Sequence, residues 1–129
     1  MSKVKRLNRQ VPKIGAKAED KKDEVLFSFK EIEPFSYTQA KNDSKFFIDF
    51  IERLKKLSEL GWQTIAKSDR HSFGFELLPI GQIKKQVDGV EKLIVFRATG
   101  NNHVFAGFRE DNVFHILFIE YNFGDLYDH

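Results

Sequence analysis

Cysteine is absent from this 129-residue sequence. Its absence excludes disulfide bonds, thiolate zinc sites and a cysteine nucleophile. No apolar run approaches the roughly 20 residues that a membrane-spanning helix needs, so we expect no membrane partner. The basic N-terminal stretch also lacks the apolar segment of a secretory signal. These absences together predict a protein of the reducing cytoplasm.

The motifs of several common chemistries are missing as well. The histidines and carboxylates show no HxH, HExxH or calcium-loop spacing, and no glycine-rich phosphate loop is present. None of the serines lies in a nucleophile-elbow context, which argues against acyl transfer. We therefore expect no metal ion and no cofactor, so any catalysis would use side chains alone.

Phenylalanine, in contrast, is abundant, with 14 residues in the chain. A chain of this length can bury one hydrophobic core without cross-links, so the sequence predicts a single domain with a Phe-rich core. This domain is expected to span residues 23–129, because the residues before it carry few large apolar side chains.

The first 22 residues form a basic segment that carries eight Lys or Arg and two acidic residues. Residues 23–129 carry thirteen Lys or Arg and seventeen acidic residues, so the formal net charge of +2 hides a strong asymmetry. The composition of residues 1–22 predicts a flexible arm. Such an arm either binds phosphates without sequence preference or is only a solvated leader. The cations that would bind nucleic acid include Lys3, Lys5, Arg6 and Arg9.

The clearest helical pattern spans Ser44–Leu60. Asn42 or Asp43 can cap its N-terminus, and Gly61 stands where a left-handed residue would end it. Apolar side chains recur every three or four residues and define one stripe. The stripe consists of Phe46, Phe47, Phe50, Ile51, Leu54 and Leu57. This pattern predicts a scaffold helix that packs its apolar face on the core.

Alternating and β-branched runs indicate strands elsewhere in the chain. Residues 25–30 and 73–78 are expected to form two strands, with a short helix near residues 63–67 between them. Three further apolar runs are separated only by short Gly, Asn and Asp connections, which predicts an antiparallel meander. These runs span residues 93–98, 103–108 and 113–119. The predicted fold class is α+β, with one main amphipathic helix packed on a mainly antiparallel sheet that ends in a three-stranded meander.

Tight turns at residues 100–101 and 110–111 set a trial register for the meander. In that register, Arg97 and His115 lie near each other over Ala106, on the sheet face away from the helix. A guanidinium can bind phosphate and an imidazole can transfer a proton near neutral pH, so the pair is a candidate catalytic site. The alternative is structural, with Arg97 paired to a carboxylate and His115 buried in the core.

The run KLIVFRATGNNHVFAGFREDNVFHILFIEYNFGDLYDH, residues 92–129, resembles the RelE/YoeB/ParE superfamily of small toxins. The shared pattern is a strand with a basic residue, a Gly turn, a second strand, an acidic turn, an apolar strand and a polar-aromatic end. The resemblance implies a helical layer on an antiparallel sheet. It also implies an activity, since the ribosome-dependent members cleave mRNA without metal.

The resemblance implies functions for four side chains. Arg97 falls on the basic position of the first meander strand, and Tyr127 falls near the terminal Tyr that assists RNA cleavage. His129 corresponds to a terminal His, and His103 stands where the family usually has an Arg, which makes it a candidate nucleic-acid-binding residue. With His115 added, the candidate catalytic set is Arg97, His115, Tyr127 and His129. The acidic C-terminal stretch departs from the basic one of ribosome-bound toxins.

Two functions remain open from the sequence. The first is a metal-independent endoribonuclease of a toxin–antitoxin or mobile-element system, whose partners would be an antitoxin protein and RNA or the ribosome. The second is a non-catalytic interaction module of the same fold, which would bind a protein partner through the sheet and nucleic acid through the basic arm. A gyrase-directed toxin is a third function, which the sequence does not separate from the first.

Deleting residues 1–22 should leave the melting temperature within a few degrees of the full chain. These residues carry little apolar surface to bury, and ordering a backbone costs about 1–2 kcal/mol per residue. The deletion should also weaken nucleic-acid binding at low salt. Thermal unfolding and binding at two salt concentrations check both effects. Loss of cooperative unfolding in the shortened chain would show that the segment is part of the core.

Overall fold

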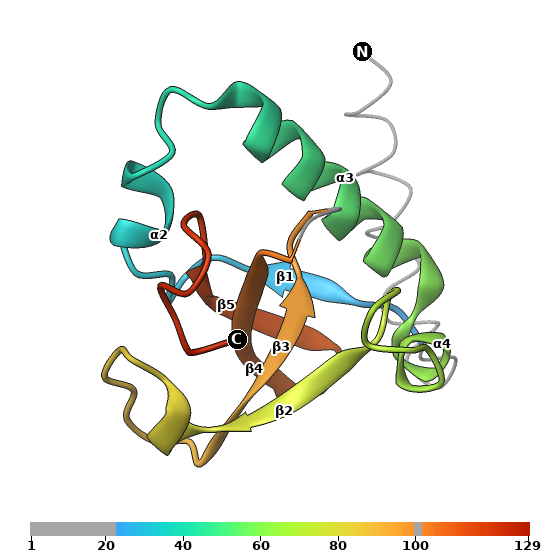
Figure 1. The fold of residues 1–129 in the computed structure, drawn as a ribbon. Helices are drawn as coiled ribbons and strands as arrows, with labels where there is room; N and C mark the ends of the chain where they lie inside the picture. The colour runs from blue at the N-terminus through green and yellow to red at the C-terminus, as the bar shows by residue number, and fades with distance from the viewer. Residues whose placement is uncertain (1–22, 100–101) are drawn as a thin grey trace.

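The computed structural model describes residues 23–99 and 102–129, and Figure 1 shows how they are arranged. The main helix, α3 (Ser44–Leu60), follows a short helix, α2 (Phe35–Thr38), and leads directly into α4 (Trp62–Ala66). A 3-10 turn, η2 (Ile80–Gln82), follows the second strand. The five strands are β1 (Leu26–Ser28), β2 (Phe75–Pro79), β3 (Lys92–Arg97), β4 (Val104–Glu110) and β5 (Val113–Ile119).

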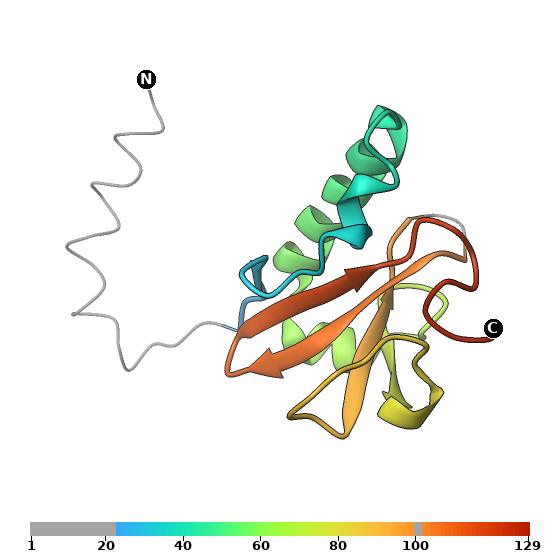
Figure 2. The same ribbon diagram turned by 90° about the vertical axis from the view of Figure 1, so that its left-hand side faces the viewer.

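The strands form one sheet in the order β1-β5-β4-β3-β2. β1 runs parallel to β5, and every other neighbouring pair is antiparallel. The chain passes from β1 at one edge through the helices to β2 at the other edge, and the meander then returns until β5 meets β1 (Figures 1 and 2). This arrangement confirms the predicted α+β class, the main helix and the C-terminal meander.

The basic arm predicted for residues 1–22 lies outside the described residues, and so do its candidate nucleic-acid-binding side chains. These are Lys3, Lys5, Arg6 and Arg9. Within the described ranges, no helix is both long enough and apolar enough to cross a membrane.

Local sequence sets both ends of α3, as predicted. The Asp43 carboxylate accepts a hydrogen bond from the Phe46 backbone N–H at 3.0 Å, which satisfies a donor of the first turn. Gly61 follows the last turn with a φ of 85°, a left-handed conformation that glycine adopts without a Cβ clash. The Asp23 carboxylate then accepts from the Trp62 N–H at 3.0 Å, so a residue before β1 caps the start of α4.

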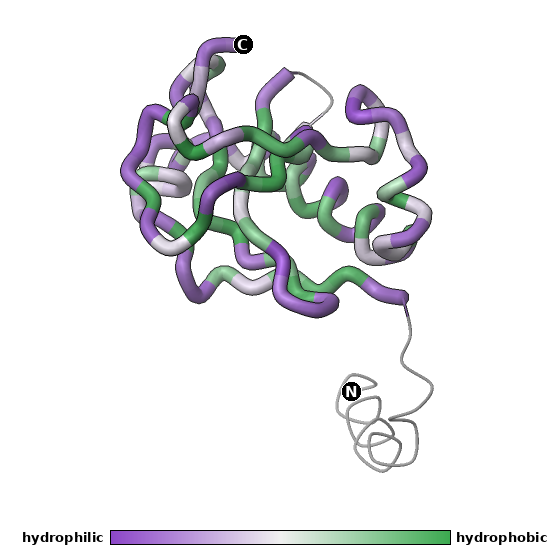
Figure 3. The backbone as a smooth tube through the Cα atoms, turned by 90° about the horizontal axis from the view of Figure 1, so that it is seen from below, coloured by the Kyte–Doolittle hydropathy of each residue, from purple (hydrophilic) through white to green (hydrophobic). Residues whose placement is uncertain are grey.

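The sheet buries both of its faces, and Figure 3 shows hydrophobic stretches mostly toward the middle of the molecule. On the face covered by α3 and α4, the rings of Phe96, Phe105 and Phe114 are fully buried, with centroids 5.2 to 5.8 Å apart. This contact confirms the predicted Phe-rich core. The opposite face is covered by the segment after β2 and by the C-terminal segment, which contribute Ile83 and Leu126.

The connection between β4 and β5 is a two-residue turn, displaced by one residue from the prediction. Glu110 pairs with Val113, so residues 111–112 form the turn in place of residues 110–111. Asp111 takes a φ of 53°, the left-handed value that such a turn requires and that Asp tolerates. The pairing of β5 with β4 is therefore displaced from the predicted register.

A β-bulge between β4 and β5 changes which side chains face α3. Ala106 pairs with Phe118, whereas the next residue, Gly107, pairs with Ile116, so β5 accommodates one extra residue. Glycine is needed at this position because a Cβ on Gly107 would overlap the His115 carbonyl oxygen. Phe118 consequently joins the core on the face away from α3, and its predicted place on the helix-facing side was wrong.

The apolar stripe of α3 is narrower than the sequence pattern indicates. Phe50, Leu54 and Leu57 are buried, but Ile51 is 55% exposed and lies on the outer side of the helix. A single straight helix on one sheet face can bury only the side chains that point toward that face.

Phe50→Ala should lower the free energy of unfolding by about 3–5 kcal/mol. The Phe50 ring is 1% exposed and meets Phe105 edge to face at a centroid distance of 5.2 Å. Ile51→Ala is the matched control on the exposed side of the same helix, and it should change stability by less than about 1 kcal/mol. Chemical denaturation measures both variants, and equal losses would contradict the packing of α3.

Candidate functional site

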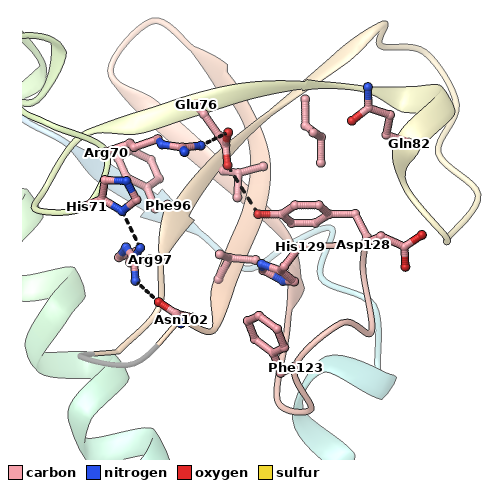
Figure 4. Close-up of a pocket in the computed structure, with 14 residues that line it drawn as sticks. Arg70, His71, Glu76, Gln82, Phe96, Arg97, Asn102, Phe123, Asp128 and His129 are labelled. Carbon is pink, nitrogen blue, oxygen red and sulfur yellow. Dashed lines mark hydrogen bonds and ion pairs between the residues drawn. The ribbon is translucent and has the colours of Figure 1, made fainter.

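A cavity of about 400 Å³ lies on the sheet face away from α3. Val95 and Val104 contribute to it from β3 and β4, and its sides come from the stretch before β2 and from the C-terminal segment (Figure 4). The polar and aromatic side chains that line it include Arg70, His71, Glu76, Gln82, Arg97, Asn102, Phe123, Tyr127, Asp128 and His129. Three of the four predicted catalytic residues, Arg97, Tyr127 and His129, thus line one cavity.

Arg97 ends β3 and makes hydrogen bonds with His71 and Asn102 at the side of the cavity. Its Nη2 donates to Nδ1 of His71 at 2.7 Å, and its Nη1 donates to Oδ1 of Asn102 at 2.6 Å (Figure 4). A guanidinium has no acceptor atom, so Nδ1 of His71 must accept and the ring proton lies on Nε2. The contact therefore holds His71 as a neutral imidazole with one N–H still able to donate.

Arg53 of α3 holds the two loops that flank Arg97. Its guanidinium donates to the carbonyl oxygens of Ser72 at 3.0 Å and Thr99 at 3.2 Å, and it lies over the Phe73 ring at 4.8 Å. Burial, and after it the positive charge of Arg97, lowers the pKa of Arg53 below its usual value. The two guanidinium groups therefore repel each other, and an anion bound at Arg97 would reduce that repulsion.

Glu76 of β2 connects Arg70 with Tyr127 across the cavity. Arg70 donates to Oε2 of Glu76 at 2.7 Å, and the Tyr127 hydroxyl makes a long hydrogen bond of 3.4 Å to Oε1. Burial of the phenol, together with the carboxylates of Glu76 and Glu120, raises the pKa of Tyr127 to about 12. Tyr127 therefore keeps its proton at neutral pH and can donate a hydrogen bond, but it cannot act as a base.

The carboxylate of Glu120 organises the C-terminal segment. Glu120 follows β5 directly and has no exposed surface. It accepts hydrogen bonds from the N–H groups of Gly124 at 3.0 Å and Leu126 at 3.3 Å, and Nε2 of His129 lies 3.0 Å from both of its oxygens. These contacts fold the segment back onto the sheet and bring Tyr127 and His129 to the cavity.

The structure does not bring His115 to the cavity. His115 pairs with Phe108 of β4, whereas Arg97 pairs with Val104, an offset of four residues that corresponds to roughly 13 Å along β4. The His115 ring stacks on Phe108 at 4.8 Å, and its Nε2 lies 2.9 Å from Oε1 of Glu110. The predicted proximity of Arg97 and His115 was wrong because the displaced turn moves His115 from beside Ala106 to beside Phe108.

His103, the fifth candidate nucleic-acid-binding residue, also lies outside the cavity. Its ring meets those of Phe46 and Phe123 edge to face, at 6.2 Å in each case. Its Nδ1 lies 3.2 Å from the Glu120 carbonyl oxygen, a contact in which the imidazole donates. The half-buried His103 ring is thus already in contact with other groups of the protein.

Several residues in or next to the cavity had little or no sequence signal. His71 lies 26 residues before Arg97, in a loop with no periodic pattern, so nothing in the sequence connected the two. Glu120 had a weak signal, because an acidic residue that continues an apolar strand is expected to be buried and therefore to need a hydrogen-bond partner. Phe123 could not be distinguished from an ordinary core residue.

Comparisons with known proteins return no match, whether with protein families, with curated proteins or with solved structures. The resemblance to the RelE/YoeB/ParE superfamily therefore stays a prediction. Among residues 23–99 and 102–129, no group of three or more His, Asp or Glu side chains is arranged to hold a metal ion. The chemistry that this site supports is that of guanidinium, imidazole and phenol groups.

Tyr127 should ionise at about pH 12, against about 10 for an unperturbed tyrosine. Because the pKa is raised in the folded state, the stabilising contribution of Tyr127 is fully present below about pH 10 and is lost as the pH rises toward 12. Tyrosinate absorbance during alkaline titration of the wild type and Tyr127→Phe isolates this step. If the wild type shows a tyrosinate step near pH 10 that Tyr127→Phe lacks, Tyr127 ionises like an unperturbed tyrosine. That result would contradict burial of its hydroxyl.

Proposed function

We propose that this protein is a metal-independent endoribonuclease and that the cavity is its active site. The observation that carries the proposal is the convergence of Arg97, His71, Tyr127 and His129 on one cavity (Figure 4). Two imidazoles and a guanidinium are sufficient for phosphodiester cleavage without a metal ion. Three of these four residues were also candidates from the sequence alone.

The reaction is the attack of a ribose 2′-oxygen on the adjacent phosphorus. The P–O2′ bond forms and the P–O5′ bond breaks, which leaves a 2′,3′-cyclic phosphate and a 5′-hydroxyl. A base takes the proton of the 2′-hydroxyl, and an acid gives a proton to the departing 5′-oxygen. Negative charge grows on the non-bridging oxygens of the phosphate in the transition state, and a fixed cation stabilises it.

The cavity offers a group for each of these tasks. Arg97 would bind the non-bridging oxygens while its contact with Asn102 holds the guanidinium. His71 and His129 lie on different sides of the cavity (Figure 4). His129 donates its Nε2–H to Glu120, which leaves Nδ1 to act as the base. His71 would act as the acid once its Nδ1, which accepts from Arg97 in the free protein, takes up a proton. Tyr127, which keeps its proton, would donate a hydrogen bond that orients the substrate.

The charges at the edge of the cavity are compatible with a polyanion. Glu76 pairs with Arg70 at 2.7 Å, and Asp128 pairs with Lys84 at 2.9 Å. Each carboxylate is thus matched by a cation, which reduces its repulsion toward a phosphate.

A second function is favoured by the outer surface of α3. Ile48 and Ile51 are 56% and 55% exposed there, and with Phe47 they line a shallow apolar depression. An interaction module would use such a surface for a protein partner. Cleavage assays separate this function from the first.

Arg97→Ala should reduce RNA cleavage by about 10²–10³-fold, because it removes the cation that stabilises the phosphate. His71→Gln and His129→Gln should each reduce it by about 10²–10⁴-fold, because each removes a proton-transfer group. Mapped RNA ends measure the effect, on free single-stranded RNA and on translated mRNA after induced expression. Wild-type cleavage should persist in EDTA and leave cyclic phosphate ends.

Arg109→Ala is the matched control, since Arg109 also lies on the sheet but stacks on Trp62 at 4.1 Å on the helix side. It should leave cleavage unchanged, and Arg97→Ala, His71→Gln and Arg109→Ala should melt near the wild type. His129→Gln should melt lower, because it also removes the imidazole contact of the buried Glu120 carboxylate. A strong loss of cleavage in His115→Gln would contradict the assignment of this cavity. Absence of cleavage on both substrates would leave the interaction module as the function.

A further inference from the structure

Phe123 presents a large apolar ring at the cavity. The side chain is 54% exposed and lies beside His129 (Figure 4). One face of its ring stacks on the His129 ring, with a centroid distance of 4.0 Å and an interplanar angle of 25°. His129 in turn lies 4.2 Å from the Tyr127 ring, so Phe123 is the outermost ring of a column of three.

The exposure of Phe123 is built into the fold, because the residues on both sides of it are held. The Tyr121 hydroxyl donates to the Asp43 carboxylate at 2.7 Å, which ties the loop to the start of α3. The Gly124 N–H donates to the buried Glu120 carboxylate at 3.0 Å. The ring is therefore in place before a ligand arrives, and a ligand that stacks on it loses less entropy on binding.

Its surroundings distinguish Phe123 from the other exposed apolar side chains of the described part. Phe29, Ile48 and Leu77 are about as exposed, but they do not line the cavity that holds Arg97. A protein partner covers a broad apolar patch, whereas a single flat ring in the same cavity as a guanidinium suits a ligand that carries both a planar group and an anion.

We infer that Phe123 stacks a nucleobase of single-stranded RNA whose neighbouring phosphate lies at Arg97, an inference that rests on the proposed function. Every base has a flat π-face, so this contact tolerates any sequence. In a duplex both faces of a base already stack on its neighbours, so only an unpaired base can reach the ring. The cavity thus binds single-stranded RNA. It requires an unpaired base at this position but does not select which base.

The test is equilibrium binding of the full chain to a short, labelled single strand in which every 2′-hydroxyl is methylated, so that cleavage cannot occur. Phe123→Ala should weaken the Kd by about 5- to 150-fold, the range for loss of one base–aromatic stack. Phe123→Tyr should bind like the wild type. Phe123→Leu, which keeps apolar packing on His129, should bind as weakly as Phe123→Ala.

Two controls separate stacking from general effects. Phe29→Ala removes a similarly exposed ring outside the cavity and should leave the Kd unchanged. A strand with the same phosphates but without bases should bind the wild type more weakly, and Phe123→Ala should not weaken it further. Equal binding of the two strands to the wild type, or equal effects of Phe123→Ala and Phe29→Ala, would overturn the inference.

The binding measurement and the cleavage assay test the two proposals separately. Cleavage that requires Arg97, with a Kd insensitive to Phe123→Ala, would overturn the stacking inference and leave the proposed function. A Phe123-dependent Kd without any cleavage would support stacking and overturn the enzyme. If the methylated strand does not bind at all, the stacking inference is overturned as well.

Discussion

The buried carboxylate of Glu120 is the group on which one whole side of the molecule depends. A carboxylate without exposed surface is expensive to bury unless hydrogen bonds replace its water, and here two backbone N–H groups and the His129 imidazole do so. Those donors all belong to residues 124–129, so the charge is satisfied only when the C-terminal segment is folded back. The same fold places Leu126 in the core, so apolar burial and charge satisfaction require the same conformation.

The cavity depends on this segment from one side and on α3 from the other. Arg53 extends from α3 to the carbonyl oxygens of Ser72 and Thr99, next to the loops that carry His71 and Asn102. The packing of α3 on its Phe-rich face therefore determines where the groups on the opposite face lie. A sheet buried on both faces can connect the two in this way, because neither face moves independently of the strands.

Local sequence patterns were sufficient to predict the main helix and the strands of the meander. The period of the apolar residues specified α3, Asp43 and Gly61 specified its ends, and the short polar connections specified the meander. Of the candidate site, Arg97 was identified from the trial register of the meander, and the resemblance of residues 92–129 to a toxin family pointed to Arg97, Tyr127 and His129. These features depend on residues close together in the chain, which is the information that a single sequence carries.

What only the tertiary structure decided is which of these side chains meet. A turn displaced by one residue moved His115 away from Arg97, because a displaced turn changes the partner of every residue in the strand that follows it. The bulge beside Gly107 then changed the partners of residues 118 and 119. The imidazole that Arg97 does contact, His71, comes from a distant loop with no pattern of its own. The sequence by itself determined the α+β fold and part of the site's composition, whereas the close neighbours of Arg97 depended on long-range packing that no local periodicity encodes.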